Sequence, residues 1–107
     1  MSVASNGHQD QLMVSGFVEA PQGRDGLLEI RRSMSIKANE GQEVGRVAAI
    51  VVDCQSQKVT HIVLSRYVQA LEYRLVPACL IEQVAKEVVV LGISSQLVES
   101  LPEYHGS

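Results

Sequence analysis

The residues best suited to chemistry in this sequence gather around His61, the one histidine inside its regular part. A histidine acts as a metal ligand or a general base only with a partner in reach, and Asp53 and Cys54 open the loop that leads to it. Cys54, His61 and Cys79 would supply a partial metal site without a recognised ligand spacing. In the alternative that we favour, His61 forms a hydrogen bond within its strand, so the sequence predicts neither a metal nor a cofactor.

Other reaction centres have no support in the sequence. It contains no Gly-x-Ser-x-Gly motif for a serine nucleophile, and Gly41 and Gly45 stand in a β-turn context and not in a strand-to-helix phosphate loop. No basic cluster activates Cys54, which we expect to be the more exposed cysteine, and Cys79 is expected at a small buried position. We therefore predict no catalytic residue and no enzyme; a metal- or thiol-dependent enzyme is the weakest alternative.

The composition favours a globular protein and gives little support to nucleic-acid binding. Hydrophobic residues make up 46% of the 107 residues and aromatic residues only 4%, so the core must be aliphatic. The formal net charge is −3, and the basic residues are scattered apart from Arg31-Arg32. That pair, or base stacking by Tyr67 and Tyr73, could mark an RNA contact, but a solvated strand and packing at the rim are simpler interpretations.

No targeting or membrane-spanning segment is predicted. The N-terminal residues lack the basic and apolar regions of a secretory signal, and no apolar run approaches the ~18 residues that cross a membrane. The cysteines form no CxxC motif and are interpreted as reduced thiols. These features predict a cytoplasmic protein without a membrane span.

The elements that must position these residues are short strands. Residues 28–38 alternate between apolar and polar side chains, as in a strand with one wet face, and only Arg32 breaks the inward set. After a turn, residues 44–53 are apolar on both faces apart from Arg46, and residues 59–64 share this two-faced pattern. Later elements are expected as strands near 71–75 and 88–91 and as a short strand or turn at 80–84. A short helix is expected to start after Ser94 or Ser95 and to end at Leu101.

Strands that are apolar on both faces must be covered on both, because a small barrel has only one interior. We expect the outward side chains of these two strands to be Val44, Ala48, Ile50, Val52, Val59 and Val63. The terminal helix and an N-terminal arm could cover them within one chain. Alternatively they form an interaction surface for a second copy or for another protein, and the sequence leaves both possibilities open.

Residues 1–27 differ from the rest of the chain. Turn residues dominate them, and only residues 12–18 form an apolar patch, which is expected to be one weak strand. We interpret residues 1–27 as a flexible or weakly structured N-terminal arm, either a disordered tail or docked on the domain of residues 28–107.

Several short motifs follow one another in a recognisable order. They are Gly41, Val44-Gly45-Arg46-Val47, Val52-Asp53, Val59-Thr60-His61-Ile62-Val63, Val76-Pro77, Val89-Val90-Leu91 and Leu101-Pro102. In this order and spacing, over about residues 34–104, the sequence resembles the PRC-barrel family, named for the cytoplasmic part of the photosynthetic reaction-centre H subunit. It departs from the family at Gln57, where a glycine is usual, so that turn is expected to be wider or differently closed, and in residues 1–27.

The resemblance implies an all-β fold, a small and highly bent PRC-type β-barrel of about five to six short strands with a short C-terminal helix. Relatives include the C-terminal domain of a ribosome-maturation factor, and in them the barrel resembles an adapter that docks on another protein. The family has no associated catalytic residues to carry over. We therefore expect a non-enzymatic interaction module that binds another protein or a second copy of itself. An RNA- or ribosome-associated maturation factor is the alternative.

Overall fold

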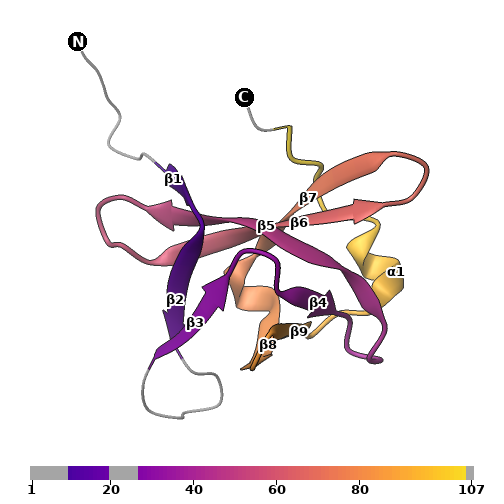
Figure 1. Cartoon of the computed structure of the whole chain (residues 1–107), viewed down its shortest axis with the longest axis horizontal. Coiled ribbons are helices and arrows are strands. Elements are labelled where there is room, and N and C mark those ends of the chain that lie inside the picture. The colour runs from indigo at the N-terminus through magenta and orange to yellow at the C-terminus, as the bar shows by residue number, and fades with distance from the viewer. Residues whose placement is uncertain (1–9, 20–26, 106–107) are drawn as a thin grey trace.

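Most of the residues that the structure describes lie in β-strands that short turns connect (Figure 1). The structure, a computed structural model, describes residues 10–19 and 27–105. These residues form one 3-10 turn, η1 (Ala78–Leu80), one short helix, α1 (Ser95–Val98), and nine strands. The strands are β1 (Asp10–Met13), β2 (Ser15–Glu19), β3 (Leu27–Arg31), β4 (Ser35–Lys37), β5 (Glu43–Asp53), β6 (Val59–Tyr67), β7 (Leu71–Pro77), β8 (Ile81–Ala85) and β9 (Val88–Leu91). The mainly β fold with one short C-terminal helix is confirmed, whereas the predicted number of strands is too small.

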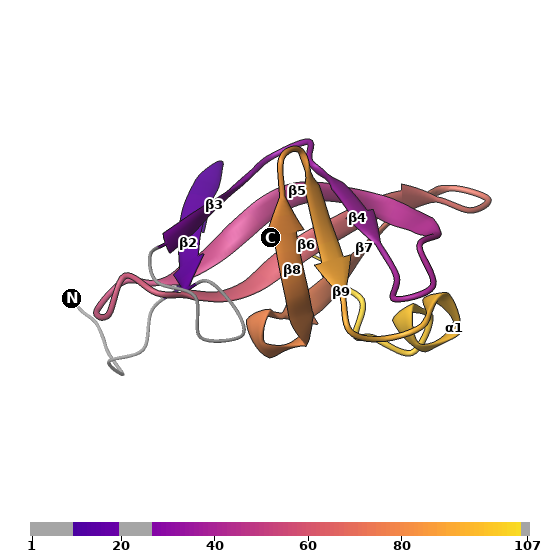
Figure 2. The same cartoon turned by 90° about the horizontal axis from the view of Figure 1, so that it is seen from below.

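Seven of the strands form one strongly curved sheet in the order β7-β6-β5-β4-β9-β8, and β1 pairs with β5 beside β4. All these pairs are antiparallel except β4 with β9, which run parallel. β2 and β3 form a separate hairpin that contacts β5. Figure 2 shows the β8–β9 hairpin crossing in front of the long strands β5 and β6. The curvature gives the sheet an inner and an outer face.

The curved sheet does not close into the predicted barrel. Among the described residues its hydrogen-bonded order ends at β7 on one side and at β8 on the other. η1 joins β7 directly to β8, so the chain bends at the point where these two strands would have to pair to close a barrel. The outer edge of β7 is instead occupied by the C-terminal segment, since the Leu75 amide donates to the Pro102 carbonyl and the Tyr104 amide donates to the Tyr73 carbonyl. The prediction of a closed barrel is therefore wrong.

Aliphatic side chains from most of the strands meet on the inner face and form the core. The largest fully buried ones are Ile30, Ile36, Ile50, Ile62, Leu64 and Leu91. Ile30 comes from β3, so the hairpin of β2 and β3 contributes to the core. At Gly16 of β2, an added Cβ would lie 2.8 Å from Cγ2 of Val59 and 2.9 Å from Cγ2 of Ile50, so β2 packs closely on β5 and β6.

The N-terminal segment was expected to hold one weak strand. Its described part is residues 10–19 and Leu27. Residues 10–19 form two strands, of which β1 pairs with β5 and β2 pairs with β3, and Leu27 is the first residue of β3. The rest of the predicted arm, residues 1–9 and 20–26, lies outside the described residues.

Bulges decide which side chains of β5 and β6 face the core. Val44 is an extra residue of β5 opposite β4, and Ala48 is an extra residue of β5 opposite β6. In β6, Thr60 is the extra residue opposite β5. Each bulge moves the side chains that follow it to the other face of the sheet. The inner residues of β5 are therefore Val44, Val47, Ile50 and Val52. Their spacing departs from the regular interval of two residues that an unbroken strand would show.

The predicted outward set is corrected by these bulges. Val44, Ile50 and Val52 lie in the core, and Val59 packs against it. Of the six predicted residues, only Ala48 and Val63 line the outer face. A strict alternation from Val44 onward assigns the wrong face because it passes through a bulge.

The start of the helix follows local side-chain chemistry. Ser94 is the N-cap of α1, and its hydroxyl accepts a hydrogen bond from the Leu97 amide at 3.2 Å, as predicted. The helix ends at Val98 and not at Leu101. The amides of residues 99–101 each donate to the carbonyl three residues earlier, so a tighter turn continues to Leu101. Val98 is fully buried, whereas Leu97 is 55% exposed.

Gln57, which departs from the pattern that the sequence resembles, has a backbone conformation that favours glycine. Its φ is +63°, in the left-handed region that favours glycine. The Gln57 amide donates to the Asp53 carbonyl at 2.7 Å, and its side chain donates to the Cys54 carbonyl at 3.0 Å. The chain therefore keeps here a conformation that a glycine would adopt at lower cost.

We expect Gln57→Gly to raise the free energy of unfolding by about 0.5–1 kcal/mol, because relief of left-handed strain exceeds the loss of one exposed hydrogen bond. Urea unfolding measures the change. Gln57→Ala is the matched control, since it removes the same hydrogen bond and keeps the strain, and it should be less stable than the wild type. A glycine variant no more stable than the alanine variant would contradict the argument.

Candidate functional site

His61, for which the sequence favoured a hydrogen bond within its strand over a role as metal ligand or general base, makes such a hydrogen bond. Its Nδ1 lies 3.0 Å from Oγ1 of Thr60, and that hydroxyl donates to a main-chain carbonyl of β5 at 3.4 Å. In the described part of the chain, no group of three or more His, Cys, Asp and Glu side chains is placed to hold a metal ion. His61, Cys54 and Cys79 are therefore not brought together as ligands.

The exposure of the two cysteines differs from the prediction. Cys54 is partly buried, and Cys79 is exposed. Cys79 lies in the middle of η1, where the tight turn directs it outward while its neighbour Leu80 packs against the core. The expectation that Cys79 occupies a small buried position is wrong for this reason.

The outer face of β5, β6 and β7 carries rows of side chains that strand pairing aligns. Arg46, Ser65 and Tyr73 are direct neighbours across the three strands. The next row along the strands consists of Ala49, Val63 and Leu75. Direct neighbours on one face lie roughly 5 Å apart, so each row is a continuous surface.

Part of this outer face is covered by the chain itself. Val51 is 6% exposed and Val63 is 2% exposed, although neither belongs to the core cluster. Leu12 of β1 and Tyr104 of the C-terminal segment lie with Val51 around a small hollow. The N-terminal strand and the C-terminal segment thus provide some of the cover that two-faced strands require, and α1 places Val98 in the core instead.

The uncovered part of the outer face forms a groove of about 700 Å³. Its floor is lined by Ala48 and Ala49, which are partly buried, and by Val63, which is almost fully covered. We call it the β5–β7 groove. On the β5 side it is bordered by Arg32, Ser33 and Arg46, and on the β7 side by Tyr73, Tyr104 and His105.

The turn between β3 and β4 fixes one border of the β5–β7 groove. The Ser33 amide donates to the Val47 carbonyl at 2.8 Å, and the Ser33 carbonyl accepts a hydrogen bond from Nη1 of Arg46 at 3.1 Å. Ser33 has a φ of +80°, a conformation that costs a serine about 1 kcal/mol or more. The strained turn thereby holds the Arg46 guanidinium at the groove.

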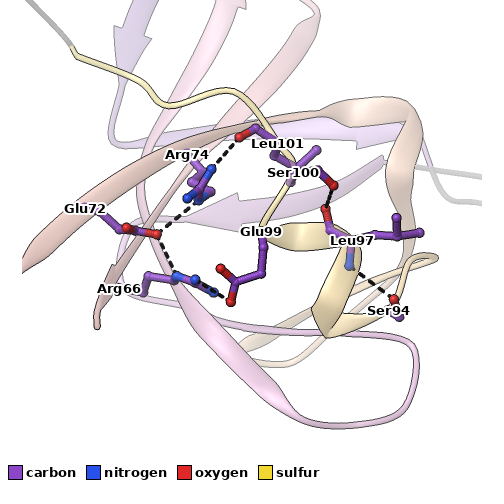
Figure 3. Close-up of polar contacts among 8 residues, drawn as sticks. All are labelled: Arg66, Glu72, Arg74, Ser94, Leu97, Glu99, Ser100 and Leu101. Carbon is purple, nitrogen blue, oxygen red and sulfur yellow. Dashed lines mark hydrogen bonds and ion pairs between the residues drawn. The ribbon is translucent and has the colours of Figure 1, made fainter. Parts of the chain in front are cut away.

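A chain of ion pairs ties the segment after α1 to β6 and β7 (Figure 3). Glu72 accepts hydrogen bonds from Nε of Arg66 at 2.9 Å and from Nε of Arg74 at 3.0 Å. Arg66 also pairs with Glu99 at 2.8 Å, and Nη1 of Arg74 donates to the Leu101 carbonyl at 2.6 Å. We call these contacts the Glu72 brace. They hold the segment that continues to the groove border at Tyr104.

The Glu72 brace makes stability depend on pH. Hydrogen bonds from Arg74 and then from Arg66 hold the pKa of Glu72 below its usual value. A carboxyl group with a lowered folded-state pKa contributes stability above the pKa of the unfolded chain, near 4.3, and loses it as the pH falls through the folded-state pKa. We expect Glu72→Gln to unfold at lower urea than the wild type at pH 7, with the difference shrinking as the pH is lowered toward 3.

Glu82 of β8 gives the matched control for this experiment, because its side chain is exposed and forms no ion pair within residues 10–19 and 27–105. Glu82→Gln should change the urea midpoint little at any pH. A Glu72→Gln difference that stays constant between pH 7 and pH 3 would contradict the role of the charged carboxylate.

Exposed apolar side chains gather at the hairpin between β6 and β7. Tyr67 is 79% exposed, Val68 is 63% exposed and Leu71 is 43% exposed. We call these residues the hairpin tip. The hairpin tip directly follows the Arg66–Glu72 pair, and Tyr67 faces Leu71 across the hairpin. A second exposed set, Leu12, Met13, Val14 and Phe17, lies on β1 and β2 and the residue between them.

Sequence reasoning did not identify the β5–β7 groove, although two of its residues stood out. Arg32 and Arg46 were the polar residues that interrupted otherwise apolar faces. Both border the groove, so each interruption marks a place where the face is open to solvent. Tyr104 gave no such signal, because its position depends on the pairing of the C-terminal segment with β7.

Comparison of the chain with models of known protein families found no match, and comparison with curated proteins found none either. No helix in the described part of the chain has the length and apolar character needed to span a membrane.

Proposed function

We propose that the chain is a non-enzymatic interaction module of the PRC-barrel type, which binds another protein or a second copy of itself through the hairpin tip. The observation that carries this proposal is the exposure of Tyr67, Val68 and Leu71 on one braced hairpin. Apolar side chains grouped on a surface are typical of sites where proteins associate. The ordered motifs from Gly41 to Pro102, with α1 following β9, support the family assignment.

The geometry of the hairpin tip suits a binding anchor. Arg66 and Glu72 pair directly across the hairpin at 2.9 Å, and the side chain of Arg66 is only 12% exposed. The strands are therefore held together up to the first exposed residue. A tyrosine presented on a rigid support loses little conformational entropy when it is buried by a partner, and tyrosine is enriched among residues that dominate binding.

The proposal is tested by measuring self-association and capture of partners with the same variants. Light scattering between about 10 and 200 µM, concentrations that bracket a weak dimer, reports the oligomeric state. The double variant Tyr67→Ser/Val68→Ser should weaken dimer formation, or recovery of co-purifying proteins from the native cell, at least tenfold. Phe17→Ser is the control, because it removes an exposed aromatic side chain from β2, which lies away from the hairpin tip (Figure 1).

A wild-type chain that stays monomeric and recovers the same proteins as the double variant would contradict the proposal. Equal losses in the double variant and in Phe17→Ser would contradict the assignment to the hairpin tip.

A further inference from the structure

The β5–β7 groove has a charge opposite to that of the whole chain. The chain carries a formal net charge of −3, yet the residues that line the groove include two arginines and no carboxylate, and the lining histidine, His105, lies 3.5 Å from the carboxylate of Glu103. Grouped cations in a concave surface attract anionic ligands more strongly than scattered ones do. The electrostatic character of the groove therefore points to a ligand that carries negative charge.

The two arginines differ in what already binds them. Arg46 is oriented by its hydrogen bond to the Ser33 carbonyl, and its Nε lies 4.0 Å from a carboxylate oxygen of Glu43. Both side chains of that pair are about half exposed, at 59% and 47%, so the pairing is weak and a ligand carboxylate can compete with it. Arg32 is exposed and forms no ion pair among the described residues. The Arg46 guanidinium is thus held in place before a ligand binds, and the Arg32 guanidinium has no competing ion pair among the described residues.

The width and floor of the groove fit an extended chain. Arg46 on β5 and Tyr73 on β7 are separated by one intervening strand, which corresponds to about 10 Å between their backbones. A helix with its side chains is about 10–12 Å across, which exceeds the space left between the side chains of the two borders. An extended peptide is narrower and fits between them. The partly buried side chains of Ala48 and Ala49 in the floor leave room for one small apolar side chain of that peptide.

From these observations we infer that the β5–β7 groove binds an extended acidic segment of a partner protein. Carboxylates of the segment pair with Arg32 and Arg46, and an apolar side chain between them lies on Ala48 and Ala49. Tyr73 and Tyr104 form the opposite border and offer hydroxyl groups and ring surface to the backbone. This surface is distinct from the hairpin tip, so the inference stands or falls separately from the proposed function.

The test uses an acetylated and amidated peptide, Glu-Asp-Val-Asp-Glu, as the probe in an NMR titration of the full chain labelled with ¹⁵N. We expect amide shifts confined to residues that line the groove, and at least fivefold weaker binding when sodium chloride is raised from about 50 to 300 mM. Arg32→Gln and Arg46→Gln should each weaken binding at least fivefold. Arg31→Gln is the matched control, because it removes the same charge at the adjacent position and Arg31 pairs with Glu87, outside the groove.

The neutral peptide Gln-Asn-Val-Asn-Gln distinguishes recognition of charge from non-specific binding. It should bind at least tenfold more weakly than the acidic peptide. Equal binding of the two peptides would overturn the inference, and so would shifts centred on the hairpin tip or the absence of shifts at millimolar peptide. Equal losses in Arg31→Gln and Arg32→Gln would also overturn it. Binding of free glutamate as tight as that of the peptide would replace the acidic segment by a small carboxylate.

Discussion

Gly45→Ala should destabilise the protein by about 2–4 kcal/mol, because the new methyl group has no space. A Cβ at this position would lie 2.5 Å from the Ser65 carbonyl oxygen and 2.8 Å from Cδ2 of Leu64. The first of these atoms belongs to the backbone of β6, which is paired with β5 on one side and β7 on the other. The strand cannot move away without breaking pairing with one of its neighbours. Urea unfolding of the two proteins measures the difference.

Gly92→Ala is the matched control for this substitution. An added Cβ at Gly92 would meet its nearest atoms at 3.7 and 3.8 Å, which is ordinary contact. The amide of Gly92 donates to the Leu80 carbonyl, and alanine retains that hydrogen bond. We expect a change within about 0.5 kcal/mol, or a small gain because alanine restricts the unfolded chain. If Gly45→Ala lowers the free energy of unfolding no more than Gly92→Ala does, the close approach of β5 and β6 at Gly45 is contradicted.

Ile50→Ala should lower the free energy of unfolding by about 3–4 kcal/mol, whereas Ala48→Ser should change it by less than about 0.5 kcal/mol. Ile50 is fully buried, pairs with Ile62 of β6 and packs against β2. Removing its side-chain atoms leaves a cavity in the centre of the core. Ala48 lines the solvent-accessible groove on the other face, where a hydroxyl group remains hydrated.

This pair of substitutions tests the bulge at Ala48 directly. Residues 48 and 50 would share one face of a regular strand and would then respond similarly to substitution. Urea unfolding at a single pH is sufficient, and Leu97→Ala, at a position 55% exposed, controls for the removal of an exposed aliphatic side chain. A cost below about 1 kcal/mol for Ile50→Ala, or a large cost for Ala48→Ser, would contradict the observed facing of β5.

Features set by neighbouring residues were predictable from the sequence. Ser94 caps α1 because a serine hydroxyl satisfies a free amide of the first turn, and Gly41 adopts a φ of +93° in the expected turn. The two-faced character of residues 44–53 and 59–64 also matches the buried residues found on both faces, Ile50 inside and Val63 outside. These conclusions needed no knowledge of distant parts of the chain.

Features that depend on long-range pairing were not predictable in the same way. The bulges at Val44 and Ala48 leave no mark in the sequence, because a slip between two apolar faces exchanges one aliphatic side chain for another. The failure of the sheet to close into a barrel depends on the segment around Pro102, which occupies the edge of β7. The β5–β7 groove depends on both the bulges and this pairing, so its position does not follow from the sequence, although Arg32 and Arg46 interrupt the apolar faces there.

The parallel pairing of β4 with β9 has a consequence for the order in which the protein is assembled. Ser35 is adjacent to Val88 in this pair, and the hairpin of β8 and β9 depends on it for its place in the sheet. During synthesis β4 therefore cannot pair with β9, its second neighbour, until most of the chain has been made. Until then one edge of the nascent sheet remains open to pairing with other chains, and such long loop closures slow folding. The newly made protein thus exposes an unpaired edge of β4 until the strand at residues 88–91 has been synthesised.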